Sequence, residues 1–229
     1  MNLRACIFDC DGVVVDSNQL HVQTWMETAQ AHGYPCPDPE HIGKCGLRTT
    51  AVIRTLLHWP VTDEEAERLG NEKEERYRTR IRTDGIRPIP GVMAFLRRIA
   101  DLKMPCALGS SAPRSNAMLC LESLRITDAF QAIVTGEDVT RGKPDPEIFL
   151  TAAARLNIPP AACVVIEDAP AGVEAAHRAG MRVIALLTSH TPAELSAADA
   201  LARDFTDPAF ERAFGSMLDP ARMPPKEHR

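Results

Sequence analysis

The stretch that decides the fold lies near the start of the chain, where residues 8–17 read Phe-Asp-Cys-Asp-Gly-Val-Val-Val-Asp-Ser. It follows a short apolar run, residues 3–7, that is typical of a buried strand. Asp9 and Asp11 end this strand, and side chains two residues apart in an extended chain point the same way. Two carboxylates in such a place repel each other and are costly to desolvate, and a divalent cation with oxygen ligands would offset that cost. Gly12 would let the chain turn sharply away from them.

Length and composition bound the class of protein. A chain of 229 residues with 45% hydrophobic content fits a soluble globular protein that buries roughly 70% of its unfolded surface. The net charge is −5 and no basic block occurs, so we expect no nucleic-acid partner. We see neither an apolar run of about 18 residues nor a basic-then-apolar leader, so we expect no membrane span and no secretion. The seven cysteines are scattered, without a C-x-x-C pair, which favours reduced thiols in a cytoplasmic protein; we expect a monomer.

Helical and strand patterns divide the chain into two parts. Residues 17–87 read as helical and charged, without a strand signal: a first helix ends at Gly33, residues 48–58 form a second, and a capping box at residues 62–65 begins a third. From residue 88 onward, short apolar runs alternate with helical segments, as in a parallel sheet that is covered on both faces. The predicted strands are residues 105–111, 132–134, 162–166 and 182–187, and the predicted helices are residues 92–102, 113–124, 146–156, 170–179 and one that begins near Pro192.

We therefore predict an α/β fold with a Rossmann-like doubly wound parallel sheet as its core and a helical cap domain inserted into it. The core would consist of residues 1–16 and 88–218, the cap of residues 17–87, and residues 219–229 would form a loose tail. Ligands bind beyond the carboxyl ends of the strands in such sheets, so the polar residues that end the predicted strands should converge on one crevice. They are Asp9, Asp11, Ser110, Ser111, Glu167 and Asp168.

Four short elements stand in the order that is typical of a known family. They are Asp9-x-Asp11 after the first strand, Ser110 after a later one, Lys143 in Arg-Gly-Lys-Pro-Asp-Pro just before a helix, and Glu167 with Asp168 after another strand. In this combination the chain resembles the haloacid dehalogenase-like superfamily of phosphotransferases over nearly its whole length, the tail excepted. The helical insert resembles the small cap of the subgroup that includes β-phosphoglucomutase and many sugar phosphatases.

This resemblance implies phosphoryl transfer through an aspartyl-phosphate. Asp9 would be the nucleophile, and a carboxylate can serve because the reaction mainly needs positioning and charge neutralisation. Asp11 would act as general acid and base for the leaving and attacking oxygens. An aspartate at position 11 also implies that the phosphate is bonded to oxygen, since family members that cleave phosphonates or carbon–halogen bonds carry other residues there.

The resemblance further implies a Mg²⁺ cofactor and a site for the phosphate group. The metal ligands would be the carboxylates of Asp9 and Asp168 and the backbone carbonyl of Asp11, with Glu167 in this shell or next to it. Ser110 would donate a hydrogen bond to a phosphate oxygen. Lys143, whose backbone is restricted by its glycine and proline neighbours, would offset the phosphate charge.

The cap residues are expected to decide the substrate, and four residues are candidates for substrate contacts. In β-phosphoglucomutase a histidine at the position of His21 couples the acid/base to cap closure. Arg48 begins a helix and would meet the distal part of a substrate, and Ser111 follows the phosphate-binding serine. Arg78 matches a cap lysine of the mutase by spacing, but it stands in an arginine-rich run, so a solvated helix face is an equal alternative.

Three functions remain open. The first is a Mg²⁺-dependent phosphatase of a small phosphorylated metabolite, with a sugar phosphate as the first candidate. The second is a β-phosphoglucomutase that interconverts β-glucose 1-phosphate and glucose 6-phosphate; it would share the core motifs and differ in cap closure. The third, a non-enzymatic domain that binds a phosphorylated ligand, is disfavoured because every core motif is present.

Overall fold

The computed structural model of the chain describes residues 3–42 and 49–218. Its centre is a six-stranded sheet in which every neighbouring pair is parallel. From edge to edge the strands are β5 (Ala132–Val134), β4 (Cys106–Gly109), β1 (Ala5–Phe8), β6 (Cys163–Glu167), β7 (Arg182–Leu186) and β8 (Ala200–Ala202). The first strand lies inside the sheet and later strands are added on both sides of it. The predicted doubly wound α/β fold is therefore confirmed, and the crevice for ligands lies beyond the end of β1.

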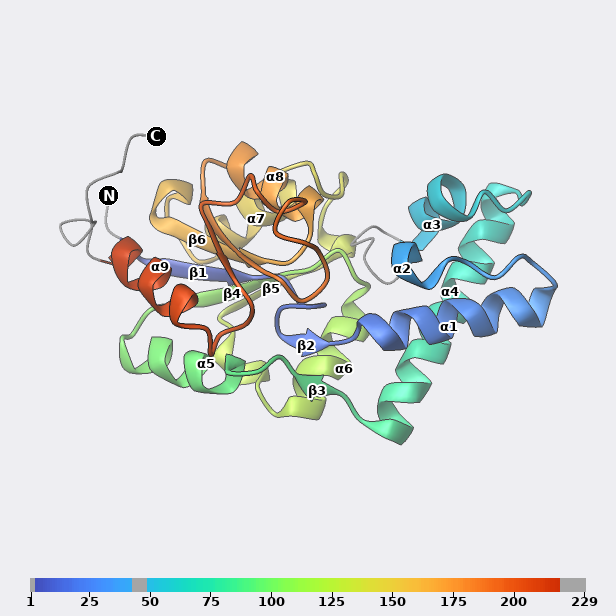
Figure 1. Cartoon of the computed structure of the whole chain (residues 1–229), viewed down its shortest axis with the longest axis horizontal. Coiled ribbons are helices and arrows are strands. Elements are labelled where there is room, and N and C mark those ends of the chain that lie inside the picture. Colours follow the sequence, from blue (N-terminus) through green and yellow to red (C-terminus); the bar gives the residue numbers. More distant parts are fainter. Residues whose placement is uncertain (1–2, 43–48, 219–229) are drawn as a thin grey trace.

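Helices cover both faces of the sheet (Figure 1). Side chains alternate along a strand, so β1 sends Phe8 to one face and Ile7 to the other, and both are fully buried. On the Phe8 face lie α5 (Val92–Asp101), α6 (Arg114–Leu124) and α9 (Pro208–Leu218). On the Ile7 face lie α7 (Glu147–Arg155) and α8 (Pro170–Arg178). Because both faces are covered, these strands are continuous apolar runs, which is why the sequence pattern found most of them.

The helical insert lies to one side of the sheet (Figure 1). It comprises α1 (Asn18–His32), α2 (Pro39–Ile42), α3 (Thr49–Val52), a π-helix η1 (Ile53–Leu57) and α4 (Asp63–Asp84). Its own apolar cluster forms around Trp25 and Trp59, whose ring centroids are 6.0 Å apart. The predicted helix ends are confirmed, since α1 is capped by Gly33 with φ 69° and the hydroxyl of Thr62 accepts a hydrogen bond from the backbone N–H of Glu65 at the start of α4.

The chain enters and leaves the insert through a two-stranded antiparallel ribbon of β2 (Val15–Asp16) and β3 (Arg87–Pro88). The expectation that residues 17–87 contain no strand is therefore wrong at Arg87. Strands of two residues are too short to produce an alternating pattern, so no sequence pattern marks this ribbon. The ribbon matters because both connections between the two parts of the molecule pass through it.

The last part of the sheet also differs from the sequence-based expectation. The helix predicted near Pro192 is wrong, because residues 192–197 form turns. Thr191 and Glu194 hydrogen-bond each other as at a helix start, but the chain then leads into β8. Just before this strand, the Asp199 carboxylate accepts from the backbone N–H of Val183 at 2.8 Å. Neither β8 nor α9 was predicted. The remaining short elements are the 3-10 turns η2 (Thr127–Ala129), η3 (Gly136–Asp138) and η4 (Pro160–Ala162).

Two further expectations concern the ends of the chain and membranes. The predicted loose tail, residues 219–229, lies outside the described residues. Within the described ranges, none of the helices combines the length and the apolar character needed to cross a membrane.

Candidate active site

The loop after β1 is a tight turn that brings acidic side chains together. The backbone carbonyl of Cys10 accepts hydrogen bonds from the backbone N–H groups of Val14 and Val15, at 2.8 and 3.0 Å. Gly12 follows with φ 72°, a conformation that favours glycine. A Cβ atom at this position would lie 1.9 Å from Oδ2 of Asp168, so glycine is needed both for the turn and for the close approach of another strand end.

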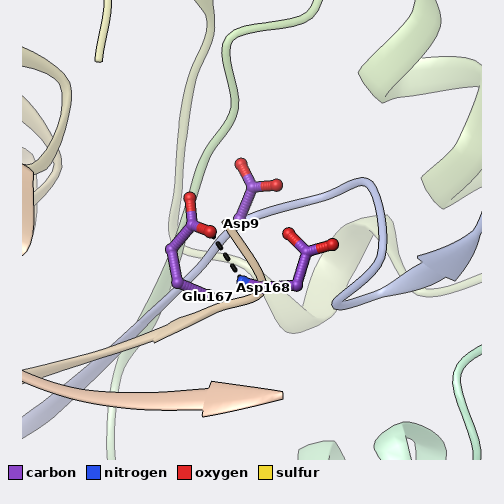
Figure 2. A group of neighbouring side chains, drawn as sticks. All are labelled: Asp9, Glu167 and Asp168. Atoms are coloured by element: carbon purple, nitrogen blue, oxygen red, sulfur yellow. Dashed lines mark hydrogen bonds between the residues drawn. The ribbon is translucent and has the colours of Figure 1, made fainter. Parts of the chain in front are cut away.

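Asp9, Glu167 and Asp168, here called the acidic cluster, meet at the ends of β1 and β6 (Figure 2). Their side chains offer ligand oxygens that all lie within 4.8 Å of one another, and the three residues are at most 7% exposed. The ammonium group of Lys143 is placed between them, 2.7 Å from Oδ1 of Asp9 and 2.6 Å from Oε1 of Glu167. Among the described residues, the three buried carboxylates of the acidic cluster therefore share one buried cation, Lys143.

This excess of negative charge perturbs the ionisation of the acidic cluster. Burial, together with the charges of Glu167 and Asp11, raises the pKa of Asp9 to about 7 even though Lys143 acts in the opposite direction. Burial and the charges of Glu167 and Asp9 raise the pKa of Asp168 well above its usual value. A small divalent cation with oxygen ligands would relieve both effects, so the donor set fits such an ion.

The two oxygens of Glu167 are already engaged by the protein. Oε1 accepts from Lys143, and Oε2 accepts from the backbone N–H groups of Asp168 and Ala169 at 2.6 and 2.7 Å. Burial alone would lower the pKa of Lys143. The negative charges of Asp9 and Glu167 outweigh the effect of burial and raise this pKa. Both oxygens of Glu167 are thus engaged within the protein, and one of them holds the ammonium of Lys143.

Asp11 is oriented differently from the acidic cluster. Its Oδ1 accepts from the hydroxyl of Ser17 at 2.6 Å and of Tyr77 at 3.2 Å, and it lies 3.1 Å from Nε2 of His21. Burial alone would raise the pKa of Asp11, but the contacts with His21 and Ser17 and the charge of Lys73 outweigh it and hold this pKa below its usual range. Within the described part of the chain the hydrogen bonds gather on Oδ1, which leaves Oδ2 for a reacting group.

A chain of polar contacts leads from Asp11 into the cap. The ammonium of Lys73 lies 2.8 Å from Nδ1 of His21. An ammonium group can only donate, so Nδ1 accepts and Nε2 carries the hydrogen that points to Asp11. The ring of Tyr77 stacks on His21 with centroids 4.4 Å apart and an interplanar angle of 9°. Lys73 also contacts Oε1 of Glu74 at 3.1 Å, which extends the network along α4.

The other predicted site residues are distributed as follows. Ser110 and Ser111 line the cavity between core and cap, and the buried Ser110 hydroxyl accepts from the backbone N–H of Ala112 at 3.1 Å. His21 lines the same cavity. Arg78 is not among the lining residues. Its guanidinium binds Glu75 on its own helix and, on α6, Oγ of Ser115 and Oδ1 of Asn116, so it bridges cap and core. Arg48 lies outside the described residues.

Several residues of the site were not found by sequence reasoning. Lys73, Glu74 and Tyr77 belong to the buried stripe of α4, and a signal for them existed. Buried positions of that helix recur at spacings of three and four, and two charged residues in such a stripe are unusual. No comparable signal marks Ser189, whose hydroxyl donates to the carboxylate of Asp168 and itself accepts from Asn18 at 2.7 Å.

The cavity that joins these groups lies between α1 and α4 of the insert and the carboxyl ends of the strands. Its volume is about 80 Å³, and its walls carry Asp9, Asp11 and Lys143 on the core side and His21 and Lys73 on the insert side. Small-molecule sites in proteins are typically about 300 Å³ or larger. The insert therefore stands close to the core in this structure.

Comparison with known proteins identifies the family. Residues 6–186 match the haloacid dehalogenase-like hydrolases. Validoxylamine A 7'-phosphate phosphatase from Streptomyces hygroscopicus subsp. limoneus is 29% identical over 214 residues, which cover 89% of this chain and 95% of that protein. Beta-phosphoglucomutase from Bacillus subtilis (strain 168) is 34% identical over 187 residues, 78% of this chain and 81% of that protein. The crystal structure of a beta-phosphoglucomutase from Clostridium difficile has a TM-score of 0.82 and 27% identity, and the match covers 96% of this chain and 99% of that one.

The predicted resemblance, which rested on the motifs at the strand ends, is thus confirmed by sequence and by structure. The relatives include both phosphatases and phosphomutases. The chain is therefore a member of the haloacid dehalogenase-like hydrolase family and an enzyme of the hydrolase or phosphotransferase kind.

Proposed function

We propose that this protein is a Mg²⁺-dependent phosphatase of small phosphorylated metabolites, with a sugar phosphate as the first candidate. The observation that carries the proposal is the pairing of a buried, under-neutralised carboxylate, Asp9, with the ammonium of Lys143 at 2.7 Å in the acidic cluster. Such a site attracts a divalent cation, and cation and lysine together can accept a phosphate dianion beside a carboxylate nucleophile. The names of several relatives, which are phosphatases of phosphorylated carbohydrates or related compounds, support the substrate class.

In the first step, a carboxylate oxygen of Asp9 attacks phosphorus. A bond forms between phosphorus and this oxygen while the bond from phosphorus to the substrate oxygen breaks, and the leaving oxygen takes a proton from Asp11. The contacts of Asp11 favour its ionised form in the resting enzyme. A phosphate dianion in the same buried site raises the pKa of Asp11, which favours the protonated form that this step needs.

In the second step, water attacks phosphorus of the aspartyl-phosphate. Asp11, now ionised, takes the proton from the water, and the bond between phosphorus and Asp9 breaks to release inorganic phosphate. The contacts of Oδ1 with Ser17, His21 and Tyr77 hold the carboxylate in one orientation for both steps. The same group thus serves as acid and then as base.

The remaining residues bind and orient. Mg²⁺, held by the carboxylates of Asp9 and Asp168 and the backbone carbonyl of Asp11, would supply positive charge to the transferring phosphoryl group. Ser110 would donate its hydroxyl hydrogen to a phosphate oxygen, with Ser111 beside it. Glu167 would hold Lys143, consistent with its distance of 2.6 Å from the ammonium.

We further propose that the chain works as two units, a core of residues 1–16 and 88–218 and a cap of residues 17–87. Movement of the cap about the ribbon of β2 and β3 would admit the substrate, since the cavity of about 80 Å³ is small for a sugar phosphate. We also propose a cytoplasmic monomer. The thiols of the described cysteines are free, which suits a reducing compartment, and size-exclusion chromatography tests the monomer.

The second candidate is β-phosphoglucomutase activity, which the likeness to two such enzymes favours. A paired assay on β-glucose 1-phosphate, with Mg²⁺ and a trace of β-glucose 1,6-bisphosphate, separates the two functions. Free phosphate without glucose 6-phosphate is expected for the phosphatase. Rapid formation of glucose 6-phosphate with little free phosphate would replace the proposal by the mutase.

A further inference from the structure

The segment after β7, here called the β7 loop, consists of Thr188, Ser189 and His190 and lies against the acidic cluster. The hydroxyl of Thr188 donates to the backbone carbonyl of Gly12, in the turn after β1, at 2.6 Å. The hydroxyl of Ser189 donates to Oδ2 of Asp168. Nδ1 of His190 donates to the backbone carbonyl of Asp168 at 2.9 Å, since a carbonyl oxygen can only accept. The β7 loop therefore holds Asp168 by its side chain and by its backbone.

The hydroxyl of Ser189 has one hydrogen to donate, and Asn18 decides where it points. Nδ2 of Asn18 lies 2.7 Å from Oγ of Ser189 and 3.4 Å from the backbone carbonyl of Thr188. The atom that faces this carbonyl is a donor, so it is the amide nitrogen, and Oγ of Ser189 accepts from it. The hydrogen of Ser189 is then directed to the Asp168 carboxylate, which can only accept in the ionised form that binds a metal.

The space around the Asp168 carboxylate leaves it little freedom to rotate. Asp168 is 5% exposed. A Cβ atom at Gly12 would lie 1.9 Å from Oδ2 of Asp168 and 2.9 Å from Oγ of Ser189, so the carboxylate and the hydroxyl both pack closely on the turn after β1. Within the described ranges, the hydroxyl of Ser189 holds Oδ2, and Oδ1 is left for a cation. Ser189 is thus placed to set the orientation in which Asp168 meets the ion.

Asn18 belongs to the cap, although it acts on a strand end of the core. It is the first residue of α1, two residues after β2. Ser17, between them, donates to the carboxylate of Asp11 at 2.6 Å. Asn18 and Ser189 both line the cavity between core and cap. The two residues that lead into the cap therefore reach Asp11 directly and Asp168 through the β7 loop.

We propose that Ser189 and Asn18 are positioning residues of the Mg²⁺ site: Ser189 sets the orientation of the Asp168 carboxylate, and Asn18 sets the orientation of the Ser189 hydroxyl. The inference rests on the proposed Mg²⁺-dependent function and adds two residues that act on the ion through Asp168. Removal of a hydrogen-bond partner that orients a metal ligand typically lowers metal affinity by about 10–100-fold. Because Asn18 lies on α1, the metal site is complete only while the start of the cap lies against the β7 loop.

The test measures the binding of Mg²⁺ alone, without substrate, from the rise of Tm over a Mg²⁺ titration. The variants are Ser189→Ala, Asn18→Ala and the double variant. The matched controls are Ser196→Ala and Gln19→Ala, which remove the same kinds of side chain at exposed positions nearby. A second readout, at saturating p-nitrophenyl phosphate, is the Mg²⁺ concentration that gives half of the maximal rate of hydrolysis.

We expect Ser189→Ala to raise the dissociation constant of Mg²⁺ about tenfold or more and Asn18→Ala to raise it several-fold, with no change in the controls. The double variant should bind Mg²⁺ as Ser189→Ala does, because Asn18 acts through the hydroxyl that this substitution removes. At saturating Mg²⁺, KM for p-nitrophenyl phosphate should change less than the Mg²⁺ constant does. A purely structural role would lower Tm without this selective loss of Mg²⁺ binding.

An unchanged Mg²⁺ constant in Ser189→Ala, or losses that add in the double variant, would overturn the proposal, while Mg²⁺-dependent hydrolysis by the wild type upholds the phosphatase. Circular dichroism verifies that each variant folds. If Ser189→Ala does not fold, Asn18→Ala decides alone, and an unchanged Mg²⁺ constant in that variant overturns the proposal. A wild type that binds no Mg²⁺ overturns the proposed function and this inference with it.

Discussion

Replacement of Lys143 by methionine tests the electrostatic account of the site. The lysine is 7% exposed, and its ammonium lies 2.7 and 2.6 Å from the carboxylates of Asp9 and Glu167. Methionine fills much of the same space beside the ring of Phe149, which the ammonium contacts at 4.9 Å from the centroid. The variant therefore removes the charge and leaves most of the packing.

The expected loss of unfolding free energy is about 3–5 kcal/mol, because removal of one partner of a buried ion pair leaves its carboxylates without compensation. In a chain of this length each kcal/mol shifts Tm by about 2–4 °C, so Tm should fall by about 6–20 °C at pH 8. Lys143 lowers the pKa of Asp9, so without it that pKa rises further above about 7. When folding raises the pKa of a carboxyl group, the free energy of unfolding falls as the pH rises through that pKa. The loss of unfolding free energy caused by Lys143→Met should therefore be smaller at pH 5 than at pH 8.

Thermal unfolding in Mg²⁺-free buffer at pH 5 and pH 8 measures this effect, with the exposed Lys103→Met as the matched control. Circular dichroism at low temperature first verifies that the variant folds. A loss below about 1 kcal/mol at pH 8, or equal losses at the two pH values, would refute the reasoning.

Three further predictions concern the same site. Mg²⁺ should raise Tm more at pH 8 than at pH 5 in a thermal-shift assay, because it competes with protons for Asp9, whose pKa is raised to about 7; an equal rise at both pH values contradicts this. Tyr77→Phe removes a donor to the Asp11 carboxylate and so raises the pKa of Asp11, the acid of the first step; the basic limb of the kcat/KM profile should move upward by about one pH unit, and an unmoved limb would count against the contact. Gly172→Ala would place a Cβ 1.8 Å from Oε1 of Glu167 and should cost about 1–3 kcal/mol in urea unfolding. Gly215→Ala, with no atom within 4 Å of the new Cβ, should cost far less.

The sequence was sufficient for five of the six strands of the sheet, because these strands are buried on both faces and read as apolar runs. β6 is an example, with all five residues buried. The residues that end such strands could be assigned to one crevice by topology alone, and the acidic cluster lies there. Elements without a strong pattern were missed: the ribbon of β2 and β3 has two residues in each strand, and β8 lies at the sheet edge with two of its three residues only partly buried.

The cap contacts depend on segments that are distant in the sequence. His21 on α1 meets Lys73 on α4, and Glu74 meets Asn116 on α6, and no local pattern specifies such pairings. Arg78 illustrates the limit, since its spacing suggested a substrate contact while its guanidinium bridges α4 and α6. Periodicity can mark a position as buried, but its partner follows only from the packing of the helices.

The most direct test of the central claim is to identify the residue that carries the phosphoryl group during turnover. The enzyme would be mixed with Mg²⁺ and p-nitrophenyl phosphate, quenched in acid within the first turnover and mapped by peptide mass spectrometry. We predict one phosphoryl group on the peptide that contains Asp9, and its loss, with loss of turnover, in Asp9→Asn. Turnover by Asp9→Asn at the wild-type rate, or a phosphoryl group on another residue, would contradict the account.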